Sequence, residues 1–251
     1  MDFTIQIYNE LLESMMNSGY SFQTFEGFMK NPKEKVIVLR HDVDKLPQNS
    51  LRFAQIQHKL GIQGTYYFRC VPESYDENII KEIASLGHEI GYHYEEMDLC
   101  NGNKDEAIEL FELNLKKLRK LTPIESICMH GSPRSKHDNK SLWKKNNYTD
   151  YDIVGEPYFD VNFNKVTYLT DTGRTWNGSR FSVRDKVNSP FELTIASTQQ
   201  LIRSIKKKQL TNQIMLTFHP QRWTSQTGAW FKELILQNVK NSIKRILVKR
   251  A

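Results

Sequence analysis

The chain has 251 residues, of which 39% are hydrophobic and 25% are charged, a balance typical of a globular protein of one or two domains. No apolar stretch is long enough to span a membrane, and the first residues lack the pattern of a secretion signal, so we expect a cytoplasmic protein. The net charge of +6 is concentrated in residues 206–208 and the last predicted helix, without interleaved aromatic residues, which argues against nucleic acid as a partner. The three cysteines lack metal-type spacing and are expected to be reduced thiols.

Residues 1–34 are predicted to form a helical preface. Ile5, Tyr8 and Leu12 recur at helical spacing, and Gly19 lies where such a helix would stop. Pattern and composition then predict an alternation of strands and helices. The predicted strands cover 36–44, 64–69, 88–93, 124–129, 166–170 and 214–218, and the predicted helices cover 50–60, 76–86, 104–121, 195–206 and 229–248. This rhythm predicts parallel βαβ units, and the absence of a linker or composition break predicts a single domain over 1–251.

The first strand of this series runs directly into a cluster of charged residues. Strand geometry places Asp42 and Asp44 on one face and His41 on the opposite face. Two carboxylates on one face repel each other unless a cation or a proton lies between them, so we expect a metal ligand beside a general base. The alternative is a helix cap or a salt-bridged loop that uses Arg40 and Lys45.

The other strands also end in reactive side chains. In chain order the strand ends carry Asp42 and Asp44, His93, His130, Asp171 and His219. Because parallel strands deliver their carboxyl ends to one edge, we expect these groups to meet at one mouth if the strands form a barrel. An aspartate with two histidines suits one divalent ion, with zinc the expected metal, and leaves a position open for water. Such an ion polarises an acyl oxygen while a carboxylate and a histidine move protons.

Three segments resemble the motifs of the polysaccharide deacetylases, the NodB-homology carbohydrate esterases. They are Arg-His-Asp-Val-Asp at 40–44, Gly-His-Glu-Ile-Gly-Tyr-His at 87–93 and Leu-Thr-Phe-His at 216–219. The resemblance spans residues 36 to 222 in the family's motif order, and residues 61–68 are similar to its second strand. It implies an α/β fold of one irregular (β/α) barrel and a metal-dependent removal of an N- or O-acetyl group from a sugar.

The resemblance also implies roles by position. Asp42 would be the catalytic base, Asp44 the metal-binding carboxylate, His93 the first metal-binding histidine and His219 the catalytic acid. The family usually has its two aspartates adjacent, whereas here Val43 separates them.

One position departs from the family pattern. The family has a second histidine four residues after the first, and this chain has Met97 there. A thioether is a poor zinc ligand beside carboxylate and imidazole. His130 is our first choice for the third ligand because it also ends a strand; the alternatives are Glu95, Glu96 and Asp98.

Several residues after strand ends are candidates for substrate binding. Asp171 and Trp176 resemble the family's fourth motif, which supports the catalytic residues or lines the pocket, and Asp171 is the expected partner of His219. Arg174 and Arg222 could hold an anionic or sugar group, as could Arg134 and Trp223, although each could equally be a surface residue.

Together these features predict a metal-dependent hydrolase acting on a sugar. Because no export signal is visible, we expect a nucleotide-linked or lipid-linked sugar intermediate of surface-polysaccharide biosynthesis as the substrate. One alternative is an amidohydrolase of the same fold that acts on a non-sugar C–N bond, and another is a metal-free barrel that only binds a sugar. The identity of the sugar, the acyl group and the oligomeric state cannot be predicted from these residues.

Overall fold

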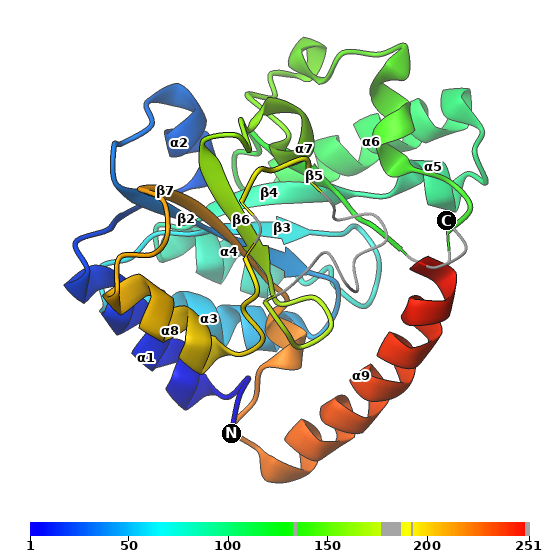
Figure 1. Cartoon of the computed structure of the whole chain (residues 1–251). Helices are drawn as coiled ribbons and strands as arrows, with labels where there is room; N and C mark the ends of the chain where they lie inside the picture. The colour runs from blue at the N-terminus through cyan, green and yellow to red at the C-terminus, as the bar shows by residue number, and fades with distance from the viewer. Residues whose placement is uncertain (133–134, 177–186, 192, 249–251) are drawn as a thin grey trace.

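The structure is a computed structural model that describes residues 1–132, 135–176, 187–191 and 193–248, with the side chains of 243–248 outside the description (Figure 1). The strands are β1 Ser21–Gln23, β2 Val36–Val43, β3 Thr65–Phe68, β4 Glu89–Tyr94, β5 Ile127–Met129, β6 Val166–Thr170 and β7 Gln213–Phe218. The helices are α1 Ile5–Asn17, α2 Phe25–Lys30, α3 Pro47–Lys59, α4 Glu77–Ser85, α5 Glu96–Leu99, α6 Lys104–Arg119, α7 Pro157–Asp160, α8 Thr198–Lys206 and α9 Thr227–Val248. Short 3-10 helices are η1 Asn139–Lys144, η2 Tyr148–Tyr151 and η4 Pro220–Arg222. Across the described residues, no helix combines the length and hydropathy that crossing a bilayer would need.

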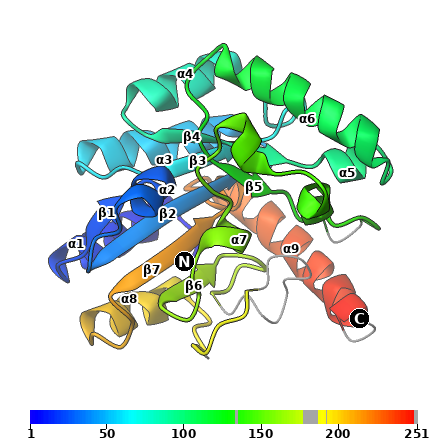
Figure 2. The same cartoon turned by 90° about the horizontal axis from the view of Figure 1, so that it is seen from above.

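All of these strands belong to one parallel sheet. Its order is β5-β4-β3-β2-β7-β6, and β1 pairs with the first part of β2. The predicted α/β class with parallel strands is therefore confirmed. Within the described residues the outer strands β5 and β6 do not pair with each other, so the barrel is open on one side (Figure 2). A parallel sheet places every strand's carboxyl end on the same edge, which is the edge that the candidate residues occupy.

The preface differs from its prediction, because it is not purely helical. Residues Ser21–Gln23 form β1, which pairs in parallel with β2 from Val36 to Val38. The following helix α2 buries Phe25 and Phe28 in an apolar cluster with Val36 and Val38. A strand of three residues is too short for its alternation to be recognised in the sequence.

The two faces of β2 bury different partners. Ile37 and Leu39 belong to the large apolar core that includes residues of α1, α3, α6 and α8, whereas Val36 and Val38 belong to the smaller cluster on the opposite face. His41 lies on the first face, where its ring stacks on Tyr66 with centroids 4.1 Å apart. The predicted placement of His41 behind the site is confirmed, and Asp42 consequently faces the interior of the half-open barrel.

Candidate active site

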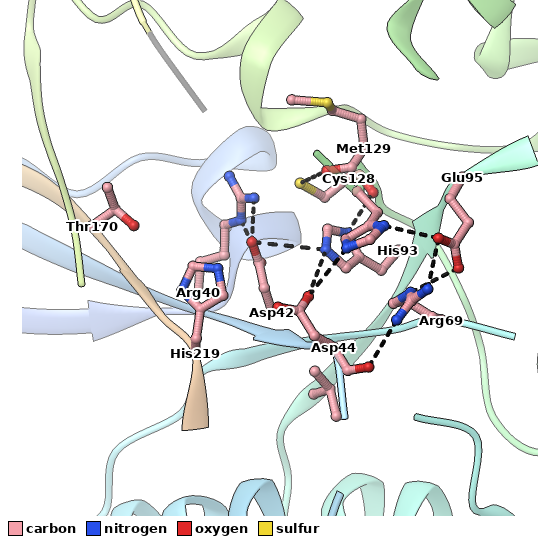
Figure 3. Close-up of polar contacts among 12 residues, drawn as sticks. Arg40, Asp42, Asp44, Arg69, His93, Glu95, Cys128, Met129, Thr170 and His219 are labelled. Atoms are coloured by element: carbon pink, nitrogen blue, oxygen red, sulfur yellow. Dashed lines mark hydrogen bonds and ion pairs between the residues drawn. The ribbon is translucent and has the colours of Figure 1, made fainter. Parts of the chain in front are cut away.

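The carboxyl edge of the sheet gathers the predicted side chains. Asp42 and Asp44 lie at the end of β2, His93 lies in β4, and His219 directly follows β7 (Figure 3). The motif glycines permit this arrangement: Gly87 ends the preceding helix with φ of 87°, and a side chain at Gly91 would collide with the ring of Tyr67.

Asp44 lies between two histidines without bonding to either. Its Oδ1 atom is 3.6 Å from His93 Nε2 and 3.7 Å from His130 Nε2, both too long for a hydrogen bond. Two ligands of one zinc ion lie roughly 3.3–3.6 Å apart, because each is about 2.0–2.2 Å from the metal. The other carboxylate oxygen, Oδ2, accepts a hydrogen bond of 2.8 Å from Gln221.

The histidine tautomers make this cluster suited to a cation. His93 Nδ1 donates to the backbone oxygen of Cys128 at 2.9 Å, and His130 Nδ1 donates to Glu95 at 2.8 Å. In this arrangement the Nε2 atoms of both rings lie on the side of Asp44 Oδ1, where a bound cation would take the place of any proton on them. That oxygen is buried and has no hydrogen-bond partner among the described residues. A buried carboxylate oxygen with two imidazole nitrogens 3.6 and 3.7 Å away fits a divalent ion among the three.

The residues around Asp44 favour the ionised form of its carboxyl group. Burial raises the pKa of this carboxyl, but His93, His219 and His130 outweigh burial and hold the pKa well below its usual range. Asp44 is therefore a carboxylate at neutral pH, the form that binds a metal.

The other candidates for the third ligand are engaged elsewhere. Met97 is 3% exposed and belongs to the large apolar core. Glu96 is buried and accepts hydrogen bonds from Tyr92 and from Asn114. The carboxylate of Asp98 accepts a hydrogen bond of 3.4 Å from Asn139, and that of Glu95 accepts one from His130 Nδ1.

A second group of potential ligands lies next to the first. Atoms of Asp42, His93 and Cys128 that could bind a metal lie within 4.8 Å of one another. Both oxygens of Asp42 already accept hydrogen bonds from Arg40, and Cys128 belongs to the smaller apolar cluster. We therefore prefer the cluster of Asp44, His93 and His130, because Asp44 Oδ1 has no hydrogen-bond partner among the described residues.

Asp42 forms a buried ion pair. Arg40 donates to its two oxygens from Nε at 2.8 Å and from the second guanidinium nitrogen at 2.7 Å, and both side chains are almost completely buried. Burial raises the pKa of Asp42, but the charges of Arg40 and His93 outweigh it, so the pKa lies below its ordinary value. Asp42 is thus ionised at neutral pH and can accept a proton.

His219 is paired with Asp171, as the sequence predicted. His219 Nδ1 lies 2.6 Å from Asp171 Oδ1, and its backbone N–H donates to the other oxygen at 2.9 Å. Arg222 and Trp223 donate to the same carboxylate at 2.9 and 2.7 Å. Burial raises the pKa of Asp171, but His219 and Arg222 outweigh burial and lower it to about 2. A carboxylate held in this way fixes the ring and stabilises an imidazolium.

The residues predicted to bind substrate lie in the layer that supports the site. Asp171 is fully buried, and Arg222 donates to it. Trp176 is 1% exposed and donates through Nε1 to Thr198, while the Arg174 guanidinium lies over the rings of Phe3 and Trp230. These contacts do not favour direct substrate binding by Asp171, Arg174 or Trp176. The partners of Arg174 and Trp176 are distant in sequence and were not predicted, whereas the pairing of Asp171 with His219 was. Arg134 lies outside the described residues.

Sequence reasoning also missed four supporting residues. Arg40 was considered only for a salt-bridged loop, although its position two residues before Asp42 puts both on one strand face. Gln221 and Arg69 gave no signal, and Glu95 was considered only as an alternative metal ligand, because each contacts the site across strands that only the fold brings together.

Comparison with protein-family models and with curated proteins found no match. Similar solved structures include a CE4 esterase from Streptococcus mutans, with a TM-score of 0.48, 14% identity and coverage of 94% of this chain and 91% of that chain. A family 4 carbohydrate esterase from Bacillus anthracis has a TM-score of 0.45, 11% identity and coverage of 96% and 89%. A CE4 family pseudoenzyme from Bacillus anthracis has a TM-score of 0.46, 14% identity and coverage of 85% of this chain. This chain spans only 63% to 65% of the length of that pseudoenzyme and of two mutants of it.

Proposed function

We propose that the protein is a metal-dependent hydrolase that removes an acetyl group from the nitrogen or oxygen of a sugar. The observation that carries the proposal is the cluster of Asp44, His93 and His130, in which Asp44 Oδ1, buried and without a hydrogen-bond partner among the described residues, lies 3.6 and 3.7 Å from the Nε2 atoms of the two histidines. An ionised carboxylate, Asp42, and an oriented histidine, His219, complete the set of groups that acyl hydrolysis needs.

The chemistry of each side chain assigns it a step of the proposed reaction. Asp44, His93 and His130 would hold one divalent ion, expected to be zinc, which supplies polarisation of the acyl oxygen and acidification of a water. Asp42 takes the proton of the attacking water, and the fork from Arg40 keeps its carboxylate in place. His219 gives a proton to the departing nitrogen or oxygen, and Asp171 stabilises its protonated ring.

The nature of the substrate rests on the motif resemblance. The segments at 40–44, 87–93 and 216–219 resemble those of polysaccharide deacetylases, which act on acetylated sugars. The single domain, a nucleotide-linked or lipid-linked intermediate, a role in surface-polysaccharide biosynthesis and a cytoplasmic location stay predictions.

The experiment measures metal content and product together. Purified protein loaded with zinc is incubated with N- and O-acetylated sugars and with non-sugar amides, and acetate, formate and ammonia are quantified. We expect one zinc per chain and acetate from the sugars, with Asp42→Asn as the inactive control that keeps its metal. Ammonia or formate from non-sugar amides alone would indicate the amidohydrolase, and sugar binding by a protein that takes up no metal would indicate a binding barrel.

A further inference from the structure

His130, the proposed third ligand, follows a different strand from the one that carries the motif histidine. Where the motif has a histidine in the segment after β4, this chain has the buried Met97, and His130 comes instead from the end of β5. That strand has only three residues and lies at the border of the sheet. A ligand at such a position needs additional support, because few ladder hydrogen bonds fix its backbone.

We propose that Glu95 and Arg69 are positioning residues that hold His130 as the third metal ligand of this chain. The proposal rests on the proposed metal-dependent function. Glu95 accepts from His130 Nδ1 at 2.8 Å, so its carboxylate selects the tautomer and fixes the angle of the ring. The backbone of His130 is held separately, since Asn139 donates to its carbonyl at 2.8 Å and its own N–H donates to Tyr94 at 2.8 Å.

Arg69 connects the two sides of the cluster. Its guanidinium donates to both oxygens of Glu95, from Nε at 2.7 Å and from a terminal nitrogen at 2.8 Å. Its other terminal nitrogen donates to the backbone carbonyl of Asp44 at 2.9 Å (Figure 3). One planar group therefore ties the segment that carries Asp44 to the carboxylate that orients His130. A guanidinium can hold both acceptors at once because its N–H donors have a fixed planar geometry, whereas the ammonium group of a lysine is a point charge.

The contrast with His93 explains why this support is needed on one side only. His93 Nδ1 donates to the backbone carbonyl of Cys128, its register partner on the neighbouring strand. That acceptor is part of the sheet and cannot rotate away. The acceptor for His130 is a side chain, so it contributes to metal binding only while Arg69 holds it. A second effect is electrostatic, because a carboxylate on Nδ1 makes the opposite ring nitrogen a stronger ligand.

Cobalt affinity tests this role without relying on turnover. Apoprotein of the wild type, Glu95→Gln, Arg69→Lys and Glu96→Gln is titrated with cobalt against a chelator, and the d–d absorption of each complex is recorded. Glu96→Gln is the matched control, since Glu96 is the adjacent buried carboxylate but contacts Tyr92 and Asn114 instead of a histidine. Melting of the apoproteins shows whether each variant is folded.

We expect Glu95→Gln to weaken cobalt binding about 10–100-fold and to change the d–d spectrum. Arg69→Lys, the milder variant, keeps the charge but cannot hold Glu95 and the Asp44 carbonyl together, so it should weaken binding in the same direction. Glu96→Gln should leave the affinity and spectrum unchanged. Folded Glu95→Gln or Arg69→Lys protein with wild-type affinity and spectrum would overturn the positioning role alone. A wild-type protein that binds no metal would overturn this role and the proposed function together.

Discussion

Replacing Asp171 by asparagine removes the charge on which the His219 pair depends while nearly preserving the shape of the side chain. The carboxylate is fully buried and accepts hydrogen bonds from the His219 ring, the His219 backbone, Arg222 and Trp223. An asparagine has one oxygen and an NH₂ group that is itself a donor, so part of this donor set would lose its acceptor.

The pKa of Asp171 determines how much of the lost free energy of unfolding depends on pH. The pKa falls from an ordinary value of 3.8 to about 2 in the folded protein. A gap of about 1.8 pH units at about 1.36 kcal/mol per unit contributes about 2 kcal/mol to the free energy of unfolding. Because the folded pKa is the lower one, this contribution is complete above pH 3.8 and is lost as the pH falls towards 2.

Urea unfolding of wild type and Asp171→Asn at neutral pH and at pH 2–4 measures this contribution. We expect the difference in free energy of unfolding between wild type and Asp171→Asn to be about 2 kcal/mol larger at neutral pH than at pH 2. The lost hydrogen bonds add a difference that does not change with pH. The same variant should lose roughly a thousandfold in deacetylation rate at neutral pH, because the His219 ring loses its orienting carboxylate. A stability difference that stays constant across this range would refute the assignment of Asp171 as a strongly stabilised carboxylate.

Four further variants separate the roles of these residues. Asp42→Asn should keep its metal but lose about two to four orders of magnitude in rate, and wild-type turnover would remove Asp42 from the role of base. His219→Ala should lower the rate least on substrates whose leaving group needs no proton. An equal loss on substrates with and without that need would mean that another group supplies the proton. His130→Ala should fold but bind no metal. Met97→Ala should bind metal but lose about 2–5 kcal/mol of its free energy of unfolding, because Met97 belongs to the core. Metal analysis and denaturation measure both properties, and the reverse pattern would contradict the assignment of His130 as a ligand.

The positions of the main elements could be predicted because their signals are local. The apolar run that begins at Val36 is itself sufficient to predict a buried strand, and Pro123 prevents the preceding helical pattern from continuing. Alternation of strands with helices then predicts a parallel sheet, and a parallel sheet predicts that the strand ends share one edge. The same reasoning predicts that Asp42, Asp44 and His219 share one edge of the sheet.

The supporting contacts could not be predicted because they depend on partners distant in the chain. Arg174 was expected near substrate, but its guanidinium lies over Phe3 and Trp230, residues that the fold brings to it from the two ends of the chain. Trp176 likewise donates to Thr198 inside the core. A position after a strand end indicates that a side chain is near the mouth, but not whether it faces the mouth or the protein.

The proposed third ligand, His130, shows which property of a metal-binding motif is physically required. A metal needs its ligands close together in space, and a parallel sheet offers equivalent positions at the ends of neighbouring strands. His93 is the register partner of Cys128, so His130, two residues after Cys128 and directly beyond the end of β5, lies on the same face and nearer the edge of the sheet. From there its Nε2 comes within 3.7 Å of Asp44, although the motif position at Met97 has become part of the apolar core. A chain without a histidine at the motif position can therefore still form a metal site, provided that a neighbouring strand supplies a ligand and a carboxylate such as Glu95 orients it.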